Sequence, residues 1–101
     1  MSYVLTMTKR ATDSFAQNLD YLKKEWGVGV TNDFIDAVEK VFETIRERPY
    51  LYPFYSSSKK IRRCIVHKRI IMFYRISGEN KVSILLFWNT WQDPNRIGLK
   101  L

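Results

Sequence analysis

Hydrophobic residues recur along this chain with two different periods, and the change of period marks the predicted elements. Residues 2–7 (SYVLTM) alternate loosely and predict a short strand. From Thr8, a residue type favoured at helix N-caps, an apolar stripe predicts an amphipathic helix that ends at Gly27. A second stripe predicts another helix, which begins within residues 28–32 and ends before Pro49. Because few residues join the two helices, we expect an antiparallel hairpin. The two stripes consist of Ala11, Phe15, Leu19, Leu22 and Trp26, and of Phe34, Ile35, Val38, Val41, Phe42 and Ile45.

The second half of the chain has the period of β-strands. Residues 49–60 form a loop rich in Tyr, Phe, Pro and Ser, which we interpret as a cap on the core rather than a stacking platform for bases. Strands are predicted at residues 61–67, 70–76 and 82–88, joined by short turns into an antiparallel meander. Both faces of the last two strands are apolar, so we expect them to be central and covered by the helix hairpin. The tail from Asn89 should run along the surface. The predicted fold class is therefore α+β, in the order β-α-α-β-β-β, with an antiparallel sheet, an N-terminal strand and the hairpin on one face.

Length and composition narrow the class of protein. The chain has 101 residues, of which 46% are hydrophobic, so we expect one globular domain over residues 1–101. The only thiol is Cys64, which excludes an intramolecular disulfide, and no Cys/His cluster predicts a zinc site. We expect no metal and no cofactor. The N-terminus lacks the pattern of a signal peptide, and the apolar run VSILLFW is too short to span a bilayer. The expected location is the cytoplasm, without membrane attachment.

The positive charge of the chain is concentrated in one segment. The formal net charge is +7, and residues 56–78 hold seven basic residues and no acidic ones, whereas the rest of the chain is balanced. Such a segment predicts a polyanionic or acidic partner, although a merely solubilising face would have the same composition. The seven residues are Lys59, Lys60, Arg62, Arg63, Lys68, Arg69 and Arg75.

Several local features together resemble a known family. Pro49 directly follows the second helix, a basic strand opens the hairpin, the strand IMFYRI carries Tyr74, and LLFWNTWQDP lies near the end. In this order they resemble the RelE/ParE superfamily of plasmid-stabilisation toxins, over essentially the whole chain up to Pro94. The resemblance implies the toxin component of a bacterial type II toxin–antitoxin system, which inhibits growth. It also implies a cognate antitoxin that wraps the toxin, and assembly into larger toxin–antitoxin complexes.

The superfamily has two kinds of activity. RelE-type members cleave messenger RNA in the ribosomal A site, whereas ParE-type members poison DNA gyrase. If the chain is of the RelE type, it is a metal-independent endoribonuclease. The resemblance then places a phosphate-binding arginine at Arg63 or its neighbour Arg62. Arg75 would be a second cation, and His67, the only histidine, would be the general base, kept neutral by the like charges beside it. Each arginine could equally be an exposed residue that pairs with an acidic antitoxin, and His67 a solvated turn residue. Tyr74 is expected in the core.

The tail departs from the pattern of the ribonucleases. Trp91 stands where many members carry an arginine, and no Tyr or His follows where ribonuclease-active members keep their catalytic acid. We therefore predict a ParE-like binding toxin that does not act as an enzyme, with DNA gyrase as a candidate target and a ribosome-dependent mRNA endoribonuclease as the alternative. A general RNA-binding module is disfavoured because no RNA-binding signature is present. The predicted contact surface for target or antitoxin consists of Lys59, Lys60, Arg62, Arg63, Lys68, Arg69 and Trp91.

Overall fold

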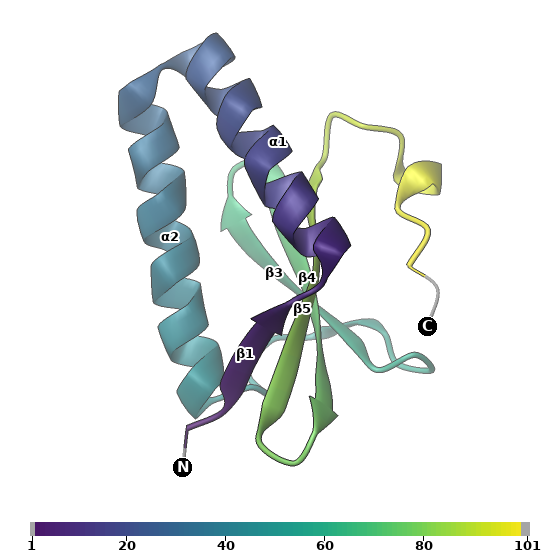
Figure 1. The fold of residues 1–101 in the computed structure, drawn as a ribbon. Helices are drawn as coiled ribbons and strands as arrows, with labels where there is room; N and C mark the ends of the chain where they lie inside the picture. The colour runs from purple at the N-terminus through teal and green to yellow at the C-terminus, as the bar shows by residue number, and fades with distance from the viewer. Residues whose placement is uncertain (1, 100–101) are drawn as a thin grey trace.

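The structure, a computed structural model, describes residues 2–99 as a helix hairpin packed on a five-stranded sheet (Figure 1). The strand order in the sheet is β1-β5-β4-β3-β2. This arrangement confirms the predicted α+β class. The elements are β1 (Val4–Met7), α1 (Lys9–Trp26), α2 (Val28–Glu47), β2 (Phe54–Ser56), β3 (Ile61–His67), β4 (Ile70–Gly78), β5 (Lys81–Asn89) and the short 3₁₀ helix η1 (Pro94–Arg96).

The two helices begin and end at the residues that the sequence indicated. The Thr8 side chain accepts a hydrogen bond from the backbone N–H of Ala11 at 3.1 Å, which caps α1. Gly27 has a φ of +88° and ends α1, and α2 begins at the next residue, Val28. Gly29 lies in the first turn of α2.

The sheet is mixed rather than wholly antiparallel. Strands β3, β4 and β5 form the predicted antiparallel meander. β1 adds to the edge of β5 in parallel, with Val4 opposite Lys81 and Met7 opposite Ile84. A further short strand, β2, lies within the segment that we expected to be a loop, and it pairs irregularly with β3.

Apolar side chains fill both faces of the central strands. On the helix face, Phe34 of α2 packs with Met72, Tyr74 and other buried residues in the larger core. On the opposite face, Phe73, Leu86 and Trp88 form a smaller core that includes Ile97 from the C-terminal segment. The helix hairpin therefore covers one face, as expected, whereas the tail covers the other. Trp88 is a core residue, 7% exposed.

Hydrogen bonds fasten the tail in this position. The Arg10 guanidinium of α1 donates to the carbonyl oxygens of Arg96 at 3.2 Å and Gly98 at 3.3 Å. Lys59 Nζ donates to the carbonyl oxygen of Leu99 at 3.2 Å. The tail is thus part of the folded unit (Figure 1). Within residues 2–99, neither long helix is apolar enough to cross a membrane.

Candidate functional site

The basic segment of the sequence is divided into two clusters by β3. Lys59 and Lys60 precede β3 and line a shallow depression with Arg75; we call these three residues the first basic cluster. Lys68 and Arg69, the second basic cluster, lie in the turn that follows β3. Because β3 has seven residues, roughly 20 Å separates its two ends. The predicted contact surface is therefore divided into two separate surfaces, one at each end of β3.

Arg62 and Arg63, between these clusters, point to different faces of the sheet. Arg62 donates to the carbonyl oxygens of Tyr50 at 3.3 Å and Tyr52 at 2.7 Å. Its guanidinium carbon also lies 4.0 Å from the centre of the Phe54 ring. Arg63 is exposed and pairs across the strands with Phe73, which belongs to the core on the face away from the helices. Arg62 therefore bonds β3 to the segment that precedes β2. Arg63, by contrast, is exposed and available to bind a partner.

His67 lies on the helix face and not beside the candidate arginines. An irregularity in register between Ile65 and His67 turns the histidine towards α2, where its ring meets that of Phe34 edge-on at 6.2 Å between centroids. Arg63 and Arg75 lie on the opposite face, because side chains two residues apart in a strand, and side chains paired across strands, share a face. Within residues 2–99, Nδ1 of His67 is buried without a hydrogen-bond partner.

Tyr74 is a core residue, as expected. Its side chain is fully buried, and its hydroxyl donates to the carbonyl oxygen of Pro49 at 2.7 Å. Burial raises the pKa of Tyr74 to about 12. The phenol proton is thus held in a strong internal bond, away from any exposed phosphate.

The second basic cluster forms an exposed site together with the tail. The Arg69 guanidinium carbon lies 4.5 Å from the centre of the Trp91 ring, and 62% of Trp91 is exposed. A backbone hydrogen bond of 2.6 Å from Thr90 N to Arg69 O joins the turn to the tail. Next to it, Trp26 and His67 line a pocket of about 300 Å³ beneath the helix hairpin. The structure thus places Arg69 and Trp91, two residues of the predicted contact surface, side by side.

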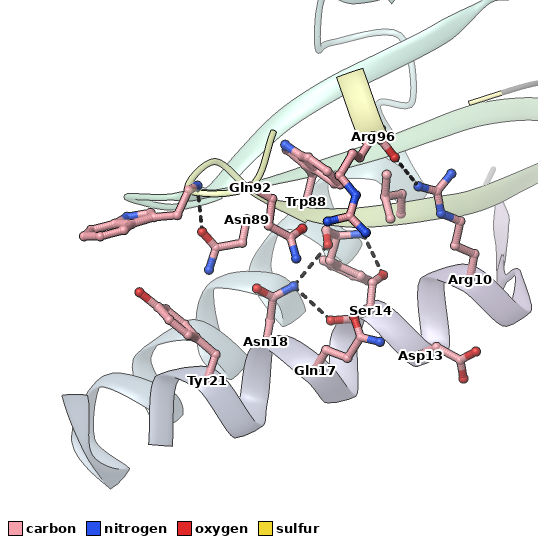
Figure 2. A pocket seen from close by; sticks show the side chains of 13 residues that line it. Arg10, Asp13, Ser14, Gln17, Asn18, Tyr21, Trp88, Asn89, Gln92 and Arg96 are labelled. Atoms are coloured by element: carbon pink, nitrogen blue, oxygen red, sulfur yellow. Dashed lines mark hydrogen bonds between the residues drawn. The ribbon is translucent and has the colours of Figure 1, made fainter. Parts of the chain in front are cut away.

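A second pocket, which the sequence did not indicate, lies between α1 and the C-terminal half of β5 (Figure 2). β1 ends at Met7, so the edge of β5 beyond Ile84 lacks a neighbouring strand on that side. Side chains of α1 replace it: Phe87 N donates to Ser14 Oγ at 3.0 Å, and Asn18 Nδ2 donates to Phe87 O at 3.0 Å. The pocket has a volume of about 440 Å³.

One signal in the sequence could have located this pocket. Ser14 and Asn18 are four residues apart, so they share a face of α1, and both are buried in the structure. Buried polar side chains need partners, and the edge of a strand supplies them. Elsewhere, no three His, Cys, Asp or Glu side chains among residues 2–99 gather as a metal site would require.

Comparisons with known proteins give consistent results. The model of the family "ParE toxin of type II toxin-antitoxin system, parDE" matches residues 5–94. A comparison with curated protein sequences finds no match. Among solved structures, the chromosomal ParDE toxin–antitoxin system from P. aeruginosa aligns with a TM-score of 0.71 at 12% identity, over 87% of this chain and 96% of that one.

Two further structures share the fold at similarly low identity. The YoeB/ParE toxin from Agrobacterium tumefaciens aligns with a TM-score of 0.63 at 9% identity, over 84% of this chain and 95% of that one. The E. coli DinJ–YafQ toxin–antitoxin complex gives a TM-score of 0.61 at 8% identity, over 97% of this chain and all of that one. At these identities the structures establish the fold.

Proposed function

The chain belongs to the ParE toxin family of type II toxin–antitoxin systems, and from this premise we propose that it inhibits growth by binding a cellular target rather than by cutting RNA. DNA gyrase is the first target to test. A cognate antitoxin neutralises the toxin, and the two exposed basic clusters offer an acidic antitoxin or target two places to bind. This function does not require a cofactor.

The separation of the candidate catalytic groups is the observation that supports this proposal. Metal-free RNA cleavage needs a base, an acid and a cation around one phosphate. Here His67 faces the helices, whereas Arg63 and Arg75 lie on the opposite face of the sheet. Tyr74 of β4 is buried, and its hydroxyl is bonded to the carbonyl oxygen of Pro49. One missing general acid or base typically costs about 10²–10⁴-fold in rate, so these groups support at most slow cleavage.

A RelE-like endoribonuclease remains the second candidate because of one observation. His67, Lys68 and Arg69 line the same pocket, and Arg69 lies against Trp91. An imidazole, two cations and an exposed indole are thus close together at one end of the sheet. This end of the molecule, rather than Arg63 and Arg75, would bind the RNA in that case.

Two assays with the purified protein distinguish the candidates. The first measures supercoiling of relaxed plasmid by gyrase, and the second is primer extension on ribosome-bound message. We expect inhibition of supercoiling and no codon-phased cuts. Cuts that disappear in His67→Ala but persist in Arg63→Ala would establish the ribonuclease instead. Expression of the chain alone should arrest growth, and co-expression with its antitoxin should restore it; normal growth at high soluble expression would contradict a toxic function.

A further inference from the structure

We propose that the 440 Å³ pocket between α1 and β5 is a nucleotide-binding site, which takes a base between Tyr21 and Trp91 and a phosphate at Arg96. This goes beyond the proposed toxicity and does not depend on which cellular target the toxin binds. The ligand is defined by its chemistry, a nucleoside phosphate, either free or as one unit of a single-stranded RNA. The pocket volume lies within the range of about 300–1,000 Å³ that is typical of small-molecule sites.

Two buried amide side chains at the bottom of the pocket offer a donor and an acceptor. Asn18 Nδ2 donates to the carbonyl oxygens of Ser14 and Phe87, so its free atom is the acceptor Oδ1. Asn89 Oδ1 accepts from Trp91 N at 3.0 Å, so its free atom is the donor Nδ2. The hydrogen-bond networks therefore fix both amide orientations. Among the described residues, neither free atom has a partner.

Both residues are largely buried, but their free atoms are not among the buried atoms without a partner in residues 2–99 and so reach the surface of the pocket. Only 5% of Asn18 and 7% of Asn89 is exposed. Both amides face the same space beside Tyr21 (Figure 2). The two free atoms are open to the pocket, so they can bond a ligand that carries the complementary donor and acceptor. The edge of a nucleobase presents such an adjacent donor and acceptor.

Aromatic side chains flank this polar pair. Tyr21 of α1, which Figure 2 shows near Asn89, and Trp91 of the tail both line the pocket. Trp91 is 62% exposed although it is a large apolar residue, and Arg69 contacts its ring without covering it. Stacking of a base on an aromatic ring is worth about 1–3 kcal/mol. Two such rings beside a hydrogen-bonding edge suit a planar heterocycle better than a peptide side chain.

The charges at the other end of the pocket favour an anion. The Arg96 side chain extends from η1 into the pocket (Figure 2), and Arg10 holds the backbone of the same segment. The only acidic residue that lines the pocket, Asp13, forms an ion pair with Lys9 at 2.7 Å. Arginine binds phosphate through a planar fork of donors. Residues suited to a base and a residue suited to a phosphate therefore line the same pocket.

Isothermal titration calorimetry with AMP, CMP, GMP, UMP, ribose 5-phosphate and a single-stranded RNA hexamer tests the site. We expect at least one nucleotide to bind and ribose 5-phosphate to bind at least about fivefold more weakly, since it lacks the stacked base. Equal binding of ribose 5-phosphate would reduce the site to a general anion site and overturn the proposal. Binding of the hexamer but of no mononucleotide would identify RNA as the source of the nucleotide, and binding of mononucleotides alone would identify a free nucleotide.

Three substitutions locate the binding. Trp91→Ala should weaken nucleotide binding about five- to 100-fold through lost stacking, and Arg96→Gln should weaken it by removing the phosphate contact. Asn89→Asp keeps the acceptor for Trp91 N but replaces the free donor with a carboxylate oxygen, so it should abolish binding. Matched controls outside the pocket, Trp26→Ala and Arg46→Gln, should bind as the parent does. Thermal denaturation of each variant separates lost binding from lost folding. No binding of any nucleotide at millimolar concentration, or binding that Trp91→Ala and Arg96→Gln leave unchanged, would overturn the proposal.

Discussion

Arg62 and Arg63 are neighbours with the same charge, but their side chains have different surroundings. Arg62 donates to two backbone carbonyls of the segment before β2 and contacts the Phe54 ring, whereas Arg63 is exposed on the other face. Alternation along a strand requires that two adjacent residues face opposite ways, but it does not tell which residue faces the loop. The difference between the two arginines therefore appears only once the pairing of β3 is known.

Replacement of each arginine by alanine tests this difference. Arg62→Ala removes two charge-assisted hydrogen bonds and a cation–π contact, so it should lower the free energy of unfolding by about 1–3 kcal/mol. Arg63→Ala is the matched control and should change it by less than about 0.5 kcal/mol. Urea denaturation followed by tryptophan fluorescence measures both. Equal stabilities would mean that the internal bonds of Arg62 contribute nothing in solution.

Tyr74 should make the stability of the protein sensitive to alkaline pH. Burial raises the pKa of Tyr74 from 10.0 to about 12 in the folded state. The folded state therefore binds this proton more tightly, and the resulting stability is fully present below pH 10 and is lost as pH rises from 10 to 12. Tyr74→Phe lacks the titrating group and also the bond to Pro49, so at pH 7 it should be about 0.5–1.5 kcal/mol less stable than the parent protein.

The deficit of Tyr74→Phe should then shrink as pH rises from 10 towards 12. Urea denaturation of both proteins at several pH values provides the measurement. Burial also raises the pKa of Tyr52 and Cys64, and both proteins contain these two groups. A deficit that stays constant across this range would show that Tyr74 ionises as easily in the folded as in the unfolded chain.

At the scale of the elements, Gly27 determines the tight connection of the helix hairpin. It is the only residue between α1 and α2, and its φ of +88° is a conformation that other residues rarely adopt. Gly27→Ala should therefore destabilise the protein by about 1–2 kcal/mol. Gly29 is the matched control: it is helical, and no atom lies within 4 Å of the position that a Cβ would take there. Gly29→Ala should stabilise by about 0.5–1 kcal/mol. Thermal melts that rank the two variants the other way would contradict this role of Gly27 in the hairpin.

The same elements illustrate what the sequence could predict. The helix stripes and the signals at Thr8 and Gly27 are local, so the helices and their ends were predicted correctly. The parallel pairing of β1 with β5 joins residues about eighty positions apart, and no local pattern encodes it. The two apolar faces of β4 and β5 predicted that both would be covered, but not that Ile97 of the tail covers one of them.

The candidate site was less predictable for a related reason. Composition correctly placed the positive charge between residues 56 and 78, but the distribution over two clusters and two faces depends on the register of β3 and its irregularity at His67. The contact of Arg69 with Trp91 joins a turn to the tail. Asn18 and Asn89 line the same pocket because α1 replaces β1 along the edge of β5. Each of these contacts depends on tertiary packing, which the periodic pattern of hydrophobic residues does not encode.

For the whole molecule, the net charge of +7 and its distribution predict how the toxin meets an acidic antitoxin. Exposed basic residues speed association with an acidic partner. At 0.1 M ionic strength, salt screens the attraction between exposed charges that are more than about 10 Å apart. The two basic clusters are roughly 20 Å apart, so a partner must span that distance to contact both. A partner that does so should respond to changes at either cluster.

Three double variants test whether both clusters contribute. The first variant, Lys59→Ala with Lys60→Ala, alters the first basic cluster. The second, Lys68→Ala with Arg69→Ala, alters the second basic cluster. The third, Lys24→Ala with Lys40→Ala, removes two exposed charges from the helices and controls for net charge. Stopped-flow association with the antitoxin at several salt concentrations is the measurement. Each cluster variant should slow association by roughly two- to tenfold at low salt, and the difference should disappear at high salt, because the attraction acts on the encounter rather than on the final contacts. The control should change the rate less, since its charges are outside the basic segment. If all three variants slow association equally, only the net charge matters, and the concentration of basic residues in this segment has no role in binding the antitoxin.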